Sequence, residues 1–110
     1  MKVFISQPMK GKTEQEILEE RERLIADIKE RIPEAEIIDS YKLLKDYIIA
    51  DDEKNALKFL GESIKALADA DTLVLAKGWE KARGCRIERL CALEYGIDVA
   101  EIITAKMWHL

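Results

Sequence analysis

The chain has 110 residues, of which 48% are hydrophobic and 36% are charged, and this composition is typical of one globular domain spanning residues 1–110. The net charge of -4 argues against a protein that binds polymeric nucleic acid, because such proteins need a basic face to displace counterions. The same charge still permits a small anionic ligand held by a few local cations.

The first predicted elements are a strand and a long helix. KVFIS, at residues 2–6, is a short apolar run typical of a buried strand, and the loop QPMKGK follows it. Thr13 and Glu16 have the spacing of a capping box and predict the start of a helix, which Pro33 ends. The predicted buried stripe of this helix is Ile17, Leu18, Leu24, Ile25, Ile28 and Ile32.

Strands and helices continue to alternate along the rest of the chain. The stretch from Ser40 to Asp52 is ambiguous, and the last seven residues form a short tail without an assigned element. The further predicted elements are a strand at 35–39, a helix capped by Asp51 or Asp52 with the stripe Leu57, Leu60, Ile64, Leu67 and Ala68, a strand at 72–76, a helix at 84–95 closed by Gly96, and a strand at 97–103.

This alternation predicts an α/β fold with right-handed crossovers and a parallel sheet of about four strands. Helices would cover both faces of the sheet, which makes the fold a three-layer sandwich. Ligands bind such sheets beyond the carboxyl ends of the strands, where the strand order reverses. With the order 2-1-3-4, that point lies between the first and third strands. The loops SQPMKGK and KGWEKARGC would then face each other across one crevice.

The first of these loops has features of a ligand-binding loop. Ser6 ends the strand, Gln7 follows it, and Gly11 permits close approach of the backbone to a ligand. The N–H groups that open the next helix, with Lys10 or Lys12, would suit an anion. A plain turn is the alternative interpretation, since the loop has neither a GxGxxG nor a GxxxxGK[ST] motif.

The second loop carries an aromatic ring and two cations. Trp79 follows Gly78, and we expect its indole either to stack on a base or to cover the core or a subunit contact. Arg83 and Arg86 open the next helix, where cations oppose the helix dipole. A bound anion or a neighbouring carboxylate would explain them, and a solvated face is the alternative.

Glu88 is the candidate for chemistry. It lies in the first turns of the predicted helix, where we expect the dipole, together with Arg86 or Arg89, to keep the carboxylate ionised. An ionised carboxylate in a dry crevice suits nucleophilic attack on the anomeric carbon of a sugar. The alternative is an ordinary glutamate at the start of a helix.

Other features point away from metals and membranes. Cys85 and Cys91 are six residues apart, so they point about 240° apart on a helix and do not pair with each other. Two thiols and the single His109 do not form a metal site. No segment approaches the roughly 20 apolar residues of a membrane span, and the first residues do not form a signal peptide. We therefore expect a cytoplasmic protein without a membrane partner.

Two blocks of the sequence resemble a known group of enzymes. VFISQPMKGKT near the start, and ADADTLVLAKGWEKARGCRIERLCALEYGIDV later, are similar to the nucleoside 2-deoxyribosyltransferase-like superfamily, and most closely to its small uncharacterised members with an ISQPM-G start and a GW--ARGC--E block. The resemblance implies a flavodoxin-like or Rossmann-like sheet, no metal or organic cofactor, and assembly as a homodimer or higher homo-oligomer.

The resemblance also implies roles for particular residues. Glu88 occupies the position of the nucleophilic glutamate, with Ala92 four residues later. The implied substrate is a deoxynucleoside or its 5′-monophosphate, hydrolysed at the N-glycosidic bond or transferred to a second base. The implied substrate-binding residues are Ser6, Gln7, Pro8, Met9, Lys10, Gly11, Gly78, Trp79, Arg83, Gly84 and Cys85.

Two rival functions remain open from the sequence. Active relatives carry an acid in the loop after the third strand, whereas this loop offers only Glu80. This favours a nucleotide-binding or signal-sensing module that uses the same crevice without catalysis. A structural adaptor that uses its acidic helix face is the third possibility.

Overall fold

The computed structural model describes residues 1–41, 53–104 and 107–109. Strands and helices alternate from the first strand to β4, as predicted. The elements are β1 (Lys2–Ser6), α1 (Glu14–Arg31), β2 (Glu36–Ile38), α3 (Glu53–Leu67), β3 (Thr72–Leu75), the short 3-10 helix η1 (Trp79–Lys81), α4 (Arg83–Glu94), β4 (Asp98–Thr104) and β5 (Met107–His109).

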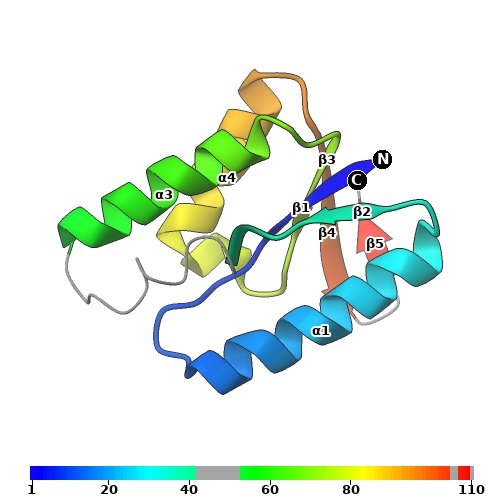
Figure 1. Ribbon diagram of the computed structural model, residues 1–110, viewed down its shortest axis with the longest axis horizontal. Coiled ribbons are helices and arrows are strands. Elements are labelled where there is room, and N and C mark those ends of the chain that lie inside the picture. The colour runs from blue at the N-terminus through cyan, green and yellow to red at the C-terminus, as the bar shows by residue number, and fades with distance from the viewer. Residues whose placement is uncertain (42–52, 105–106, 110) are drawn as a thin grey trace.

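The strands form one sheet in the order β2-β1-β3-β4-β5 (Figure 1). The four parallel strands have the predicted order 2-1-3-4, and the α/β sandwich is confirmed. The tail, to which we assigned no element, instead pairs as antiparallel β5 with β4, with Glu101 opposite His109. Only three residues long, β5 lacks a clear periodic signal in the sequence, but it shields the edge of β4.

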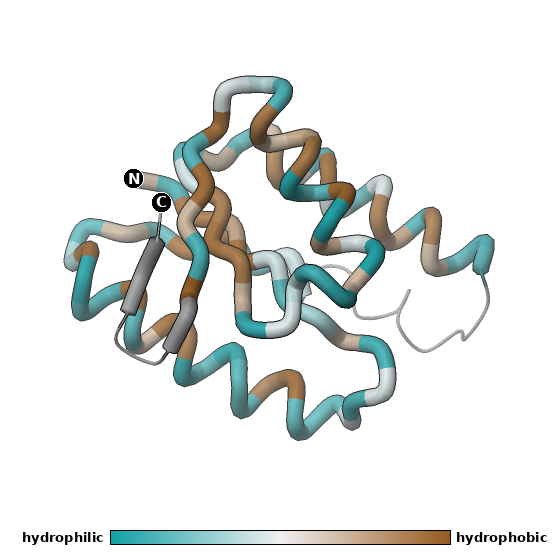
Figure 2. The backbone as a smooth tube through the Cα atoms, turned by 180° about the vertical axis from the view of Figure 1, so that it is seen from behind, coloured by the Kyte–Doolittle hydropathy of each residue, from teal (hydrophilic) through white to brown (hydrophobic). Residues whose placement is uncertain are grey.

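Helices cover both faces of the sheet because neighbouring strand residues point to opposite sides. Val3 and Ile5 belong to a core cluster with Ile28 of α1, whereas Phe4 packs in a second cluster with Leu67 of α3. Figure 2 shows hydrophobic residues concentrated along the central strands. Both faces of β1 and β3 are therefore buried, which explains their continuous apolar sequences.

The helix signals are confirmed, but Leu18 of the first predicted stripe and both Leu57 and Ala68 of the second are exposed. Thr13 and Glu16 form the predicted capping box. Leu18 is 39% exposed, because it lies beside the stripe centred on Ile17 and Ile28. Leu57 is 69% exposed, and Figure 1 shows the N-terminal end of α3 extending beyond the strands.

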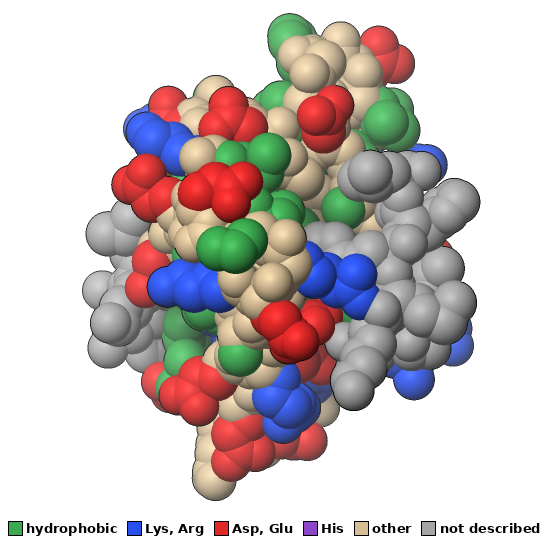
Figure 3. Space-filling model, turned by 90° about the vertical axis from the view of Figure 1, so that its right-hand side faces the viewer, with side chains coloured by type: hydrophobic (Ala, Val, Ile, Leu, Met, Phe, Trp, Pro, Cys, Tyr) green, Lys and Arg blue, Asp and Glu red, His purple; other side chains and the backbone are tan. Residues whose placement is uncertain are grey.

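The end of α4 is also as predicted, because Gly96 follows it with a φ of +75°, a left-handed conformation that glycine adopts readily. The ambiguous stretch before α3, with the proposed caps Asp51 and Asp52, lies outside the described residues. On the face drawn in Figure 3, acidic and basic side chains of the described residues are interspersed, and the basic ones do not form a continuous surface there.

Candidate functional site

The loops that follow β1 and β3 meet at the carboxyl ends of these strands. The backbone N–H of Ala76 donates to the carbonyl of Ser6 at 2.9 Å. Gly78 has a φ of +89°, and a Cβ added to it would lie 3.8 Å from Cγ of Pro8. The chain leaves β1 and β3 towards opposite sides of the sheet, so this is the point where the strand order reverses.

A buried hydrogen bond joins the two halves of this site. The Ser6 hydroxyl at the end of β1 donates to Oε1 of Glu88 on α4 at 2.6 Å. Only 1% of Ser6 and 6% of Glu88 are exposed. The short distance fits a hydroxyl that donates to a carboxylate. Residues 82 positions apart in the sequence thus form one polar pair within the core.

Glu88 differs from our expectation in its protonation. Burial raises the pKa of its carboxyl from 4.5 to about 7, although the hydrogen bond from Ser6 acts in the opposite direction. Arg86 donates to the carbonyl of Glu80 at 3.0 Å, and Arg89 lies over the ring of Trp79, so both cations have other partners. Burial therefore opposes the ionisation that we expected the dipole and these arginines to favour. A helix dipole contributes at most about 2 kcal/mol, less than the desolvation of a buried carboxylate.

Cys85 lines the same buried site one turn earlier on α4. Its thiol is 3% exposed, and burial is the main cause that raises its pKa to about 11. A hydrogen bond with Ser6 lowers this pKa, whereas the nearby Glu88 raises it. The thiol therefore stays protonated at neutral pH and provides a small, weakly polar wall rather than a nucleophile.

Two residues of the first loop bind to α1. Gln7 is buried, and its Nε2 donates to the carbonyl of Ile17 and to Oε1 of Glu20, both at 2.9 Å. Lys12 forms an ion pair with Glu20 at 3.2 Å. Gln7 and Lys12 thus fasten the loop to α1. The other predicted members of this loop are the half-buried Pro8 and Met9 and the exposed Lys10 and Gly11.

Trp79 is held between β4 and the core. Its indole Nε1 donates to Oε1 of Glu101 at 2.9 Å, and its ring packs against the cluster that contains Phe4. The guanidinium of Arg89 lies 5.0 Å from the ring centroid, a cation–π distance. The indole thus covers the core, one of the two roles expected for it, and stacking on a base remains a prediction.

Arg83 and Gly84 lie beside α3. Arg83 donates to Oε2 of Glu53 at 2.9 Å, and both side chains are largely exposed, so this pair stabilises the fold little. A Cβ added to Gly84 would lie 3.9 Å from Leu60, which places this glycine at the packing of α4 on α3. The partner of Arg83 is therefore Glu53 of α3 and not the neighbouring carboxylate of Glu88, which was one of the explanations expected for the arginines of this helix.

Arg21 is a buried polar residue that the sequence analysis missed. It is 5% exposed and donates to the carbonyl of Ile38 at 3.4 Å and to Oε1 of Gln7 at 3.5 Å. Burial lowers its pKa, while Asp39 opposes this shift. The signal was available, because Arg21 is four residues after Ile17 and therefore on the apolar stripe of α1.

The described residues offer two further observations. They include no cluster of three or more His, Cys, Asp or Glu side chains placed to bind a metal ion. None of the described helices combines the length and the apolar composition needed to cross a membrane.

The fold and this site define a class of protein: a parallel α/β sandwich with a buried Ser–Glu pair at the point where the strand order reverses. A family model described as "Domain of unknown function (DUF4406)" matches residues 1–101, and the chain belongs to this family. Searches of curated proteins and of solved structures found no match.

Proposed function

We propose that this protein is an enzyme of the nucleoside 2-deoxyribosyltransferase-like group that cleaves the N-glycosidic bond of a deoxynucleoside or of its 5′-monophosphate. The observation that carries this proposal is the buried pair of Ser6 and Glu88 at the junction of the two loops. A carboxylate in this position suits nucleophilic attack on an anomeric carbon. The resemblance of the ISQPM-G and GW--ARGC--E blocks supports the same assignment.

In the proposed reaction, the ionised carboxylate of Glu88 attacks C1′ of the sugar and forms an ester bond. The C1′–N bond breaks, and its electron pair leaves with the base, which takes a proton from water. Water or a second base then attacks C1′, loses a proton to solvent and releases the carboxylate. Ser6 holds the attacking oxygen in place and favours its ionised form. No step requires a metal or an organic cofactor.

The two loops supply candidate substrate contacts for the sugar, the phosphate and the base. Gly78 lies against Pro8, and Lys10 and Gly11 are exposed in the first loop. Arg83 is exposed at the start of α4, where its weak surface pair with Glu53 permits exchange for a phosphate. Trp79 contributes the only described tryptophan ring near these loops.

A direct assay tests the proposal. The protein is incubated with each deoxynucleoside and each 5′-monophosphate, and free base is measured by chromatography. We expect the parent to release base and the Glu88→Gln variant to lose at least about 1,000-fold in rate. Glu22→Gln removes an exposed carboxylate on α1 and should leave the rate unchanged. A Glu88→Gln variant that releases base at the parent rate contradicts the assignment.

A nucleotide-binding module is the second candidate. The raised pKa of Glu88 favours this second candidate, because burial disfavours the ionised carboxylate that nucleophilic attack requires. The exposed Glu80 is also the only acid in the loop between β3 and α4. A ligand-induced rise in melting temperature without release of base would select this candidate. No rise with any nucleotide would instead favour the structural adaptor.

A further inference from the structure

The side chains of Ser6 and Gln7 are held on opposite sides of the sheet. Ser6 ends β1, and its hydroxyl donates to Oε1 of Glu88 on α4 at 2.6 Å. Gln7 follows directly and continues the alternation of a strand, so its amide reaches the carbonyl of Ile17 on α1 at 2.9 Å. Both side chains are buried. The end of β1 is therefore fixed to α4 on one side and to α1 on the other.

The contacts of the Gln7 amide select one orientation of this group. Its Nε2 carries two hydrogens, which go to the carbonyl of Ile17 and to Oε1 of Glu20, both at 2.9 Å. Its Oε1 accepts from the guanidinium of Arg21 at 3.5 Å. A rotated amide would place its oxygen against two acceptors and its nitrogen against a cation. These three contacts on α1 therefore determine where the chain next to Ser6 lies.

Arg21 holds the oxygen side of this amide and is itself buried. It is 5% exposed and shares the stripe of Ile17, where an apolar side chain would pack without a buried charge. Its guanidinium also donates to the carbonyl of Ile38, which ends β2, at 3.4 Å, and Asp39 and Tyr41 lie close enough to act on its pKa. A buried cation where packing alone needs none indicates a functional requirement.

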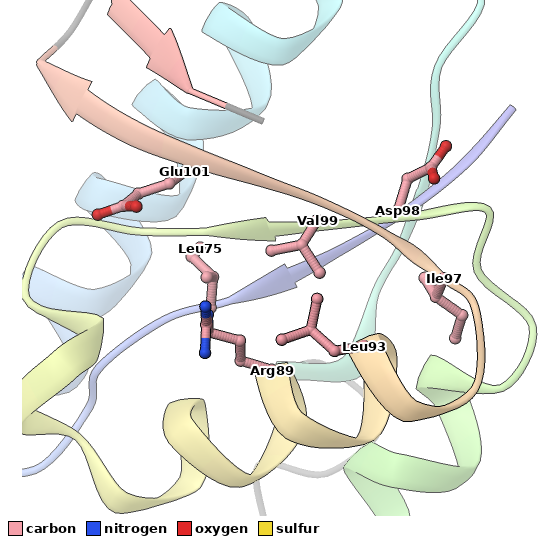
Figure 4. Close-up of a pocket in the computed structure, with 7 residues that line it drawn as sticks. All are labelled: Leu75, Arg89, Leu93, Ile97, Asp98, Val99 and Glu101. Atoms are coloured by element: carbon pink, nitrogen blue, oxygen red, sulfur yellow. The ribbon is translucent and has the colours of Figure 1, made fainter.

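The ionisation of Glu88 depends on the hydrogen bond at the other end of these contacts. Burial raises the pKa of its carboxyl, and the hydrogen bond from Ser6 lowers this pKa. The thiol of Cys85 beside it is protonated at neutral pH, because burial raises its pKa to about 11. Figure 4 shows Arg89, the next residue of α4, projecting into the groove of about 530 Å³ between α4 and the sheet. A displaced Ser6 hydroxyl would therefore leave the effect of burial on Glu88 unopposed.

We propose that Arg21 and Gln7 are positioning residues of this site: Arg21 fixes the Gln7 amide on α1, and Gln7 thereby holds the Ser6 hydroxyl against Glu88. Their part in catalysis rests on the proposed N-glycosidic reaction, whereas their effect on the Ser6–Glu88 hydrogen bond does not. The resemblance implies a substrate contact for Gln7, and the two roles differ in kinetics. Loss of a substrate contact raises KM, while a misplaced attacking group lowers kcat at an unchanged KM.

The pKa of Glu88, measured by carbon-13 NMR of labelled glutamate carboxyls, tests the positioning without turnover. Arg21→Met should raise this pKa above the parent value of about 7, as Ser6→Ala does. In the Ser6→Ala background, Arg21→Met should cause no further shift, because both changes act through one hydrogen bond. Arg23→Met, the same change at an exposed arginine of α1, is the matched control and should leave the pKa unchanged. No shift in Arg21→Met, or an equal shift in both backgrounds, overturns the proposal.

Kinetics with deoxynucleosides and their 5′-monophosphates test the part of these residues in catalysis. Gln7→Met removes the amide at similar length and should lower kcat by on the order of 100-fold at an unchanged KM. It should also raise the pKa of Glu88, and it replaces Arg21→Met in the NMR measurement if that variant does not fold. A raised KM with an unchanged kcat makes Gln7 a substrate contact and overturns its positioning role. A parent that releases no base refutes the proposed function alone, because the NMR result stands without turnover.

Discussion

Replacing Glu88 by Gln should stabilise this protein at pH 8 and have little effect on stability at pH 5. In the folded chain, burial raises the pKa of Glu88 from 4.5 to about 7, so this carboxyl is harder to ionise than in the unfolded chain. The stability that the neutral Glu88 carboxyl provides is fully present below about pH 4.5 and falls as the pH rises towards 7. Above about pH 7 the loss of stability is complete and no longer changes with pH.

The magnitude follows from the size of this shift. At 1.36 kcal/mol per pKa unit, ionising the buried Glu88 destabilises the fold by about 3 kcal/mol at pH 8 and by less than about 1 kcal/mol at pH 5. Gln has nearly the same shape and keeps an oxygen that accepts the hydrogen bond from Ser6. Removing the ionisation should therefore raise the melting temperature at pH 8 by on the order of 10 °C.

Thermal and urea denaturation of the parent and the variant at both pH values measure this difference. Glu22→Gln, an exposed site on α1, controls for the loss of a negative charge and should show no such pH dependence. An equal change in stability at pH 5 and pH 8 would refute the reasoning, because it would show that Glu88 has the same pKa in the folded and unfolded chains. Gain of stability with loss of activity is the pattern expected of a functional site.

Two further predictions concern single hydrogen bonds. Ser6→Ala removes the hydrogen bond that lowers the pKa of Glu88. The pH at which base release is half-maximal should therefore move above that of the parent. An unchanged pH profile with a lower plateau would contradict this role of Ser6. Thr13→Ala removes the side-chain cap of α1 and should lower the free energy of unfolding by about 1 kcal/mol, measured by urea titration. The pH profile of base release should not change. An unchanged free energy of unfolding would contradict the role of the cap.

Much of the fold could be predicted from local sequence signals. The capping box at Thr13, the apolar runs of β1 and β3, and Gly96 after α4 each act over a few residues, so the sequence alone reveals them. The antiparallel strand β5 could not be found in this way, because its pairing depends on β4 and on only three residues. The exposure of Leu18 and Leu57 depends on where each helix meets the sheet.

The candidate site, like the fold, was predictable from the sequence only in its local features. The sequence determined that Ser6 ends a strand, that Gly78 and Trp79 occupy a loop, and that Glu88 lies near the start of a helix, because these are local properties. Only the tertiary structure brought Ser6 within 2.6 Å of Glu88, buried both, and directed Trp79 to Glu101. The raised pKa of Glu88 also depends on the tertiary structure. Desolvation depends on every chain segment that packs around the carboxyl, and it outweighs the local helix dipole.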